Sequence, residues 1–342
     1  MDFAFDETQQ EIARLSGDVL GREPDKAWKA LGEAGLLALA VPERLGGDGL
    51  GVLEVAVLLT EVGRRAADVP ALASLALGVL PIVRFGTDEQ QNALLPLVSD
   101  NHGVLTAALS EPSAPLPSRP HTTARRDGNG YRVSGTKVAV PHASAADKIL
   151  VSALLDEGPG VLVVDPAHAE VSGGTVRLDD TRAEMLLGDD TSGRVVEGTK
   201  EYALAGAAAL ADGVLAGALE LTVGYAGTRH QFGKPLSAFQ AVACQVADVY
   251  IASRTLHLIA TSACWRLATG RDASDDLDTA AHWLAAEALP AVHTCHHLHG
   301  GVGLDVTYPM HRFYGLAKEL TRFVGGADHR LDQLAEGESR VR

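Results

Sequence analysis

Two blocks of residues in the second half of the chain carry side chains suited to hold a phosphate-bearing ligand. The first is Tyr225-Ala-Gly-Thr-Arg-His-Gln-Phe-Gly-Lys-Pro-Leu-Ser-Ala-Phe-Gln240, and the second is His296-His-Leu-His-Gly-Gly-Val-Gly303. A guanidinium such as that of Arg229 makes charge-assisted hydrogen bonds to diphosphate oxygens. A Gly-Gly-x-Gly turn lets the backbone come close to the same ligand. Together the two blocks indicate a bound dinucleotide.

Each block by itself also has a simpler interpretation. Arg-x-x-Phe-Gly fits a helix that ends in a glycine cap and carries a solvated arginine. His-Gly-Gly fits an ordinary helix-terminating turn with packed or solvated histidines. From either block alone, the ligand site and the structural interpretation both remain open.

The order and separation of the two blocks resemble the C-terminal helical domain of the acyl-CoA dehydrogenase family, whose members use FAD to desaturate acyl-CoA thioesters. Other segments extend the resemblance nearly end to end: Trp28 to Gly49, Glu61-Val-Gly-Arg64, Leu109-Ser-Glu-Pro112, Gly135-Thr-Lys137 and Tyr308-Pro-Met-His-Arg312. The third and fourth of these segments stand where family members carry their acyl-CoA and flavin loops. The resemblance implies an FAD-dependent oxidoreductase of lipid metabolism.

The periodicity of apolar residues divides the chain into three parts. Apolar residues recur at helical spacing from about Glu7 to Asn101 and again from Glu201 onward. Between about Val104 and Thr199, short Val- and Leu-rich runs separated by Gly, Asp, Asn and Pro are typical of antiparallel strands. We therefore expect an α+β protein with an N-terminal helical domain (1–103), a middle antiparallel β-domain (104–200) and a C-terminal helical bundle (201–342). This order is the acyl-CoA dehydrogenase architecture.

The resemblance also shows which chemistry is missing. The family's base is a Glu that removes the α-proton of the thioester, because burial beside the substrate raises the pKa of a carboxyl group. Counted without gaps from Gly300, the position of that base in the commonest branch falls on Val324. In other branches it matches Ala203. Neither side chain can accept a proton, so no residue of this chain is predicted to be catalytic.

Three carboxylates near these positions could serve as substitutes. Asp212 and Glu220 lie between Tyr202 and Tyr225, where we expect them on a solvated helix face or at a cap. Glu319 is more than a helical turn from Val324, so it should face elsewhere. None of the three matches a family base position.

The seat of the flavin ring departs from the family pattern as well. Family members usually follow Gly-Thr-Lys with x-Trp-Ile-Thr, whose Trp covers the ring and whose Thr donates a hydrogen bond, whereas this chain has Val138-Ala-Val-Pro141. Ala139 removes the aromatic cover, and Pro141 has neither a hydroxyl nor an N–H. The usual Gly-Ser-Asp after Glu-Pro is replaced by Pro115-Leu-Pro-Ser-Arg-Pro120.

The other half of a flavin site is kept. In this family the C-terminal domain holds the ADP end of the neighbouring subunit's FAD, and the residues that match by position are Arg229, Phe232, Gln240, His297 and Gly301. His297 stands where a Gln is usual, and a His can still donate one hydrogen bond.

The resemblance therefore implies a non-catalytic, FAD-supporting subunit of a heteromeric acyl-CoA dehydrogenase. The expected partner is a homologous catalytic subunit that carries most of the acyl-CoA site, in an α2β2 assembly with FAD at the unlike interfaces. Val41 to Gly49 and Cys295 to Gly301 resemble base-less subunits of actinobacterial enzymes that desaturate steroid side-chain CoA thioesters in cholesterol catabolism. Two alternatives stay open: a homotetrameric enzyme with Glu319 or Asp212 as an unusual base, and a flavin-free scaffold or binding protein.

Composition limits the remaining classes. A formal net charge of −15 over 342 residues disfavours nucleic acid and anionic membranes as partners. No apolar run is expected to span a bilayer, and the start of the chain lacks a signal-peptide pattern, so cytoplasm is the expected location. The cysteines Cys244, Cys264 and Cys295 have no paired-thiol spacing and are interpreted as reduced. The Cys-His-His-Leu-His run around His297 is not expected to bind a metal, because adjacent helical positions point in different directions.

Overall fold

The computed structural model describes residues 4–22, 26–128 and 130–340. Residues 1–3, on which part of the expectation about a signal peptide rests, lie outside that range. Internal contacts divide the chain into two compact units. We call Met1–Pro24, Ala56–Asp68 and Ala207–Arg342 the helical unit, and Asp25–Val55 and Val69–Gly206 the mixed unit. The three-domain division at residues 103 and 200 stays a prediction.

Short helices make up one part of the mixed unit. They are α2 (Ala27–Glu33), the π-helix η3 (Leu72–Val79), α4 (Leu80–Phe85), α5 (Asp88–Leu94) and α6 (Pro96–Ser99). Every residue of η3 is buried, which suits its run of Leu, Ala and Val. The start of α5 is fixed by a capping box, in which the Thr87 side chain accepts from the Gln90 backbone and the Gln90 side chain accepts from the Thr87 backbone.

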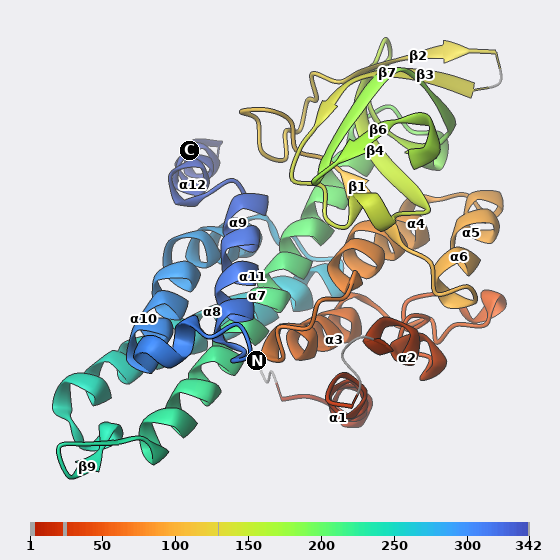
Figure 1. Cartoon of the computed structure of the whole chain (residues 1–342). Helices are drawn as coiled ribbons and strands as arrows, with labels where there is room; N and C mark the ends of the chain where they lie inside the picture. Colours follow the sequence, from red (N-terminus) through yellow and green to blue (C-terminus); the bar gives the residue numbers. More distant parts are fainter. Residues whose placement is uncertain (1–3, 23–25, 129, 341–342) are drawn as a thin grey trace. The chain divides into compact units, whose positions relative to one another are not determined.

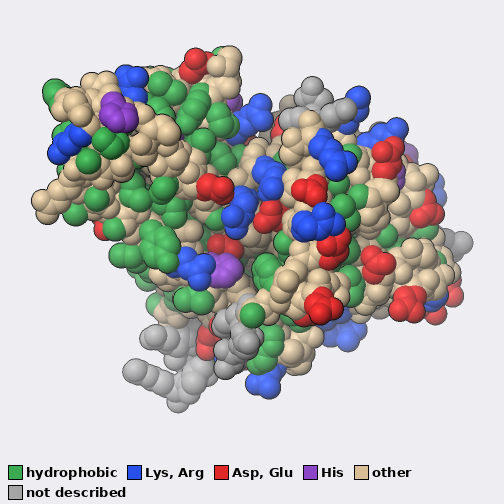
Figure 2. Space-filling view, turned by 90° about the horizontal axis from the view of Figure 1, so that it is seen from below, with side chains coloured by type: hydrophobic (Ala, Val, Ile, Leu, Met, Phe, Trp, Pro, Cys, Tyr) green, Lys and Arg blue, Asp and Glu red, His purple; other side chains and the backbone are tan. Residues whose placement is uncertain are grey.

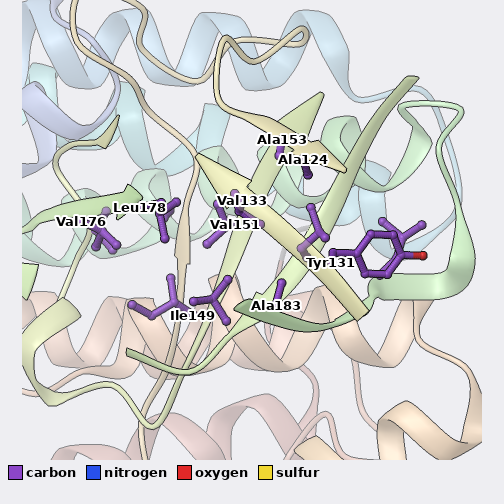
Figure 3. Packing of buried hydrophobic residues seen from close by; sticks show 14 of the residues in the cluster. Ala124, Tyr131, Val133, Ile149, Val151, Ala153, Val176, Leu178 and Ala183 are labelled. Atoms are coloured by element: carbon purple, nitrogen blue, oxygen red, sulfur yellow. The ribbon is translucent and has the colours of Figure 1, made fainter. Parts of the chain in front are cut away.

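A seven-stranded sheet makes up the rest of the mixed unit, in the order β1-β4-β2-β3-β7-β5, with β6 beside β7. Its strands are β1 (Leu105–Ala108), β2 (Thr123–Asp127), β3 (Gly130–Lys137), β4 (Lys148–Leu155), β5 (Gly158–Val164), β6 (Glu170–Ser172) and β7 (Thr175–Leu186). An additional pairing of β4 with β5 closes the sheet into a barrel. Inward-facing residues such as Val133, Val151 and Leu178 form its core (Figure 3).

The expected helical, β and helical order is confirmed by the order of the elements along the chain. Most strand pairs are antiparallel, as expected for the middle domain. Two are parallel: β1 with β4, and the single contact of β2 with β4 at Thr123 and Leu154. Val/Leu-rich runs cannot reveal this, because strand direction depends on how distant segments meet.

The helical unit is built from helices; α1 is drawn in red in Figure 1, and those of the second half of the chain run from green to blue. The helices are α1 (Glu7–Leu20), α8 (Gln240–Ala268), α9 (Ser274–Trp283), α10 (Leu289–His299), α11 (Met310–Phe323) and α12 (Ala327–Arg340). Two further helices, α3 (Val52–Arg64) and α7 (Arg194–Thr228), contribute their C-terminal parts. Helix α8 packs on α9 and α10, and α10 packs on α11.

Helices α3 and α7 cross at glycines within the helical unit. A Cβ atom added to Gly213 would lie 1.9 Å from the Thr60 carbonyl oxygen, and one added to Gly63 would lie 2.0 Å from the Leu210 carbonyl oxygen. The Thr60 hydroxyl also donates to the carbonyl of Ala209 at 3.1 Å. Only residues without a side chain allow backbones to approach this closely.

Helix α7 is long and apolar enough to cross a membrane by length and composition. The expectation that no apolar run could do so is therefore wrong as stated. In the structure, 83% of its most apolar window is buried, as is usual for the core helix of a soluble protein. The helix thus gives only weak evidence for a membrane.

Candidate dinucleotide-binding site

A short hairpin carries the first predicted block. After α7 ends at Thr228, the amide of Arg229 donates to the Tyr225 carbonyl at 2.8 Å, and β8 (His230–Gln231) pairs with β9 (Lys234–Pro235). The two residues between the strands have positive φ, 52° at Phe232 and 80° at Gly233. This is the pattern of a type I′ turn, which accepts Gly readily and a phenylalanine only with strain. The turn places Phe232 at the tip of the hairpin.

The three predicted ligand residues of this block, Arg229, Phe232 and Gln240, are exposed. Phe232 is 91% exposed, and its ring makes an edge contact with Phe239, at 6.2 Å between centroids. The Arg229 guanidinium makes no hydrogen bond or ion pair with the residues that the structure describes. Gln240 begins α8 and is exposed. A strained turn that presents an exposed aromatic ring beside a free guanidinium suits a ligand that covers both.

The second block forms the end of α10 and the turn after it. Gly300 has φ 56° and ψ −136°, a conformation far from those that residues with a side chain adopt. Gly301 is exposed, and a Cβ added to it would meet nothing within 4 Å. The backbone conformation therefore requires glycine at position 300, and a Cβ there would also meet nothing within 4 Å, so the space above both glycines is open. His297, in the last turn of α10, is exposed as well.

An aromatic stack brings the two blocks together. The rings of Tyr225 and His299 lie 4.6 Å apart with 25° between their planes. Tyr308 contacts the same imidazole at 5.3 Å. Tyr225 precedes Arg229 by one helical turn, and His299 directly precedes Gly300. Sequence reasoning missed this contact, although an aromatic residue and a histidine beside the two motifs were its available signal.

The environment of His299 favours its neutral form. The residue is 2% exposed, and its Nδ1 donates to the Cys295 carbonyl at 2.8 Å. Burial lowers the pKa of His299; the Cys295 carbonyl works in the opposite direction, and His296 lowers the pKa further. A neutral imidazole can stack on a tyrosine without bringing a charge into the core.

The two positions matched to the family base are buried and apolar. Val324 caps the C-terminus of α11 and is 0% exposed, and its carbonyl accepts from the buried Arg330 side chain. Ala203 lies within α7 and is also 0% exposed. Neither position offers a proton acceptor on a side chain. That the chain has no catalytic residue stays a prediction.

The three substitute carboxylates differ in environment. The expectation of a solvated face is wrong for Asp212, which is 6% exposed and lies 2.9 Å from Nδ1 of His257, because α8 packs against this side of α7. The Glu220 side chain is 73% exposed and lies 3.7 Å from Arg64, as a solvated face requires. Glu319 is exposed on α11 whereas Val324 is buried, so the two face different ways as expected.

The loop at the matched flavin-ring position uses its polar groups within the mixed unit. The amides of Val138 and Val140 donate to the carbonyls of Ser110 and Gly174, at 3.0 and 2.9 Å. The Pro141 carbonyl accepts from the Thr106 hydroxyl at 2.7 Å. These groups are therefore not free to bind a ring.

The Leu-Ser-Glu-Pro and Gly-Thr-Lys segments meet in a buried ion pair. Lys137 Nζ lies 2.8 Å from Glu111 Oε1 and 3.0 Å from the Ser152 hydroxyl, and both charged side chains are at most 3% exposed. The Glu111 carboxylate also accepts from the amides of His121 and Thr122, at 2.7 and 2.8 Å. In this chain the two segments thus carry a structural contact that sequence reasoning did not foresee.

The surroundings keep this pair charged at neutral pH. Burial alone would raise the pKa of Glu111, but the hydrogen bonds from Lys137, Thr122 and His121 lower it to about 2. Burial lowers the pKa of Lys137 to about 8, against the opposing effect of Glu111. The lowered pKa of Glu111 means that the fold favours the charged carboxylate, whereas the lowered pKa of Lys137 means that it disfavours the charged ammonium group. The acid dependence of stability follows from the carboxylate, which accepts several hydrogen bonds.

Comparison with known proteins identifies the family. Residues 2–101 match the acyl-CoA dehydrogenase N-terminal domain, and residues 194–338 match the acyl-CoA dehydrogenase C-terminal domain. Acyl-CoA dehydrogenase FadE28 of Mycobacterium tuberculosis is 49% identical over 343 residues, covering 98% of each chain. FadE27 of the same organism is 34% identical over 368 residues, again covering 98% of each chain. The chain belongs to the acyl-CoA dehydrogenase family, whose members use FAD.

Two solved structures are similar over nearly the whole chain. A steroid acyl-CoA dehydrogenase described as Tcur3481–Tcur3483, G363A variant, is 35% identical with a TM-score of 0.90, covering 98% of this chain and 99% of that one. The ChsE4–ChsE5 complex of Mycobacterium tuberculosis is 32% identical with a TM-score of 0.91, covering 99% of both chains. Heteromeric assemblies therefore occur among proteins similar to this one.

The described residues fit one end of FAD. Arg229 presents an unpaired guanidinium, Phe232 an uncovered ring, and Gly301 an open approach to the backbone. A diphosphate with an attached ring system has matching chemistry. The assignment of Arg229, Phe232, Gln240, His297 and Gly301 as its ligands stays a prediction.

Proposed function

We propose that this chain is the non-catalytic, FAD-supporting subunit of a heteromeric acyl-CoA dehydrogenase. The observation that carries the proposal is the contrast between two sets of residues in one chain. The residues suited to the diphosphate end of FAD are present and exposed, whereas the positions of the base and the ring seat hold Val324, Ala203 and Pro141.

The chemistry divides between two subunits accordingly. FAD, when bound, accepts the hydride that leaves the β-carbon of the acyl thioester. The residues of this chain bind and orient: Arg229 neutralises phosphate charge, Phe232 covers apolar surface, and the Gly300–Gly301 turn admits the ligand to the backbone. The α-proton goes to a Glu of a homologous catalytic subunit, which also holds most of the acyl-CoA.

Similar proteins support a homologous subunit as the partner and a steroid thioester as the substrate. The ChsE4–ChsE5 structure is a complex of two named chains, and the Tcur3481–Tcur3483 structure is described as a steroid acyl-CoA dehydrogenase. By similarity we propose an α2β2 assembly, FAD shared at the unlike interfaces, a steroid side-chain CoA thioester as substrate, and a cytoplasmic location. The face drawn in Figure 2 carries hydrophobic side chains among charged ones. On α8, the exposed apolar residues Ile251 and Leu258 are available for contact with another subunit.

The deciding experiment is co-expression with a homologous subunit that has a Glu at the base position. We expect a complex with about one FAD per heterodimer, since a ligand bound at a shared interface stabilises only the complex. The chain expressed alone should be colourless or poorly soluble. A yellow homo-oligomer of this chain that dehydrogenates an acyl-CoA would contradict the proposal.

A homotetrameric enzyme with an unusual base is the main competing function. Its candidate Asp212 is already hydrogen-bonded to His257, and Glu319 faces away from Val324, so neither is free at a matched position. A flavin-free scaffold is the other competitor. It predicts no FAD in the complex with any homologous partner, and it leaves the exposed Phe232 unexplained.

A further inference from the structure

The Tyr225–His299 stack joins the elements that carry the two halves of the proposed FAD-binding site. Tyr225 belongs to the last turns of α7, and the Tyr225 carbonyl accepts from the amide of Arg229. His299 is the last residue of α10, next to the Gly300 turn. The ring contact therefore connects the end of the helix that carries Arg229 to the glycine turn.

The His299 ring is restrained by further contacts. His299 is held by its hydrogen bond to the Cys295 carbonyl and by the Tyr308 ring. Tyr308 is tied in turn to the loop through its amide, which donates to the Asp305 carbonyl at 3.0 Å. Since His299 is 2% exposed, it has little freedom to adopt another rotamer. The stack is thus a rigid connection between α7 and α10.

We propose that Tyr225 and His299 are positioning residues that set the spacing between the Arg229 guanidinium and the Gly300–Gly301 turn, and so determine the affinity for the diphosphate end of FAD. This inference rests on the proposed function. His299 is buried, so it acts through the turn that follows it, and Tyr225 acts through the end of α7 that carries Arg229. The required property is a flat neutral ring, which both histidine and phenylalanine supply.

The test uses the co-expressed complex carrying His299→Ala or His299→Phe, with His293→Ala as the matched control. His293 lies on the same helix, is exposed, and contacts only the Tyr314 ring among the contacts that the structure describes for it. FAD is removed, and its Kd is measured by fluorescence titration, with the mass of the complex followed by light scattering. Loss of an aromatic contact is worth about 0.5–1.5 kcal/mol, which corresponds to roughly twofold to twelvefold in affinity.

We expect His299→Ala to weaken FAD binding by about fivefold to tenfold, within the range for one lost stack, while the mass of the complex is unchanged. His299→Phe should restore the affinity to within about twofold, because the ring contact is kept. His293→Ala should have no effect. Rescue by Phe separates positioning by the ring from a role of the imidazole nitrogen atoms.

A double variant tests the path of the effect. If the stack acts by placing Arg229, then Arg229→Ala and His299→Ala combined should weaken binding less than the product of the single effects. An unchanged Kd in His299→Ala, with a weakened one in Arg229→Ala, would overturn the positioning role and leave the proposed function intact. Unchanged affinity in both would overturn the proposed function too. If His299→Ala does not assemble, Tyr225→Leu removes the same stack from the other side, and the Kd for FAD is measured on that variant. An unchanged Kd there overturns the inference.

Discussion

Asp212 Oδ2 lies 2.9 Å from Nδ1 of His257 and joins α7 to α8 within the helical unit. The carboxylate is buried and its hydrogen bond is between side chains of neighbouring helices, so it contributes to packing. An acceptor held in this way is poorly placed to take a proton from a substrate, because a general base must reach the proton that it removes. We therefore expect the Asp212–His257 pair to contribute to the stability of the fold and not to the removal of a substrate proton.

Asp212→Asn should lower stability without lowering turnover. Loss of a charge-assisted hydrogen bond in a buried site costs about 1–3 kcal/mol, so the thermal midpoint of the complex should fall. Turnover per bound FAD, measured by steady-state dehydrogenation, should stay within a few-fold of the parent. Glu220→Gln and Glu319→Gln are controls, which should change neither quantity because both side chains are exposed. A hundredfold loss of turnover from any of the three, with FAD retained, would place the base in this chain.

Arg229→Ala should weaken FAD binding by about tenfold to a hundredfold, which is the loss of roughly 1.5–3 kcal/mol from one charged hydrogen bond. Assembly should survive, since the Arg229 guanidinium makes no hydrogen bond or ion pair with the described residues. Arg254→Ala removes an exposed arginine from α8 and should leave binding unchanged. Gel filtration at low FAD, followed by an absorbance spectrum, reports the difference. Equal flavin content in both variants would argue against a site at Arg229.

Lys137→Met should be strongly destabilising. It leaves the Glu111 carboxylate buried without its cation, and breaking a buried ion pair from one side costs about 3–5 kcal/mol. Denaturant unfolding of the complex should show an earlier transition of the flavin-independent signal. Lys148→Met is a suitable comparison, because the side chain of Lys148 is more exposed, at 19%, although it also contacts two carboxylates. If the two substitutions had the same small effect, the pair would not be the structural contact that its burial suggests.

Acid should weaken the same pair in a defined range. The pKa of Glu111 is about 2 in the folded protein against an ordinary value of 4.5. Its contribution to stability is therefore fully present above pH 4.5 and is lost as the pH falls from 4.5 towards 2. Urea unfolding at several pH values would measure this slope. Glu111→Gln should be less stable at neutral pH and should show a shallower slope in that range; an unchanged slope would contradict the assignment.

Val324→Glu should not create an active centre. The side chain at this position is 0% exposed, so the new carboxylate would be buried and would lower stability. The Val138–Pro141 loop would still provide no seat for a flavin ring, and a base without an adjacent hydride acceptor completes no reaction. The measurement is turnover per FAD in the complex, with the partner's catalytic Glu replaced by Gln. Restored dehydrogenation in that background would contradict the proposal.

The sequence predicted most of the fold because local pattern determines it. Helical spacing around Leu53 and Val62 and the Val-rich runs of β4 and β5 indicate the right elements, and the order of those elements indicates the family. The sequence also indicated which motif positions lack chemistry, since the identity of Val324 or Pro141 needs no coordinates. Barrel closure and the parallel pairing of β1 with β4 could not be predicted, because both depend on contacts between distant segments.

Contacts between side chains were the other unpredictable part. Asp212 was expected on a solvated face, and only the packing of α8 on α7 shows that it is buried. The charges of Glu111 and Lys137 could be read individually, yet their separation of 26 positions gave no sign of a pair. The same holds for Tyr225 and His299, which are brought together by tertiary structure alone.

The glycine crossing of α3 and α7 affects how variation in this protein should be interpreted. Gly63 and Gly213 tolerate no side chain, so substitutions there will be removed by selection as efficiently as substitutions of a ligand-binding residue. A mutational scan that scores only cell growth or the amount of reaction product would mark both the glycines and the ligand-binding residues as intolerant. It would then suggest a second functional centre at the helix crossing. Scoring cellular abundance beside flavin content would separate residues needed to fold from those needed to hold the cofactor.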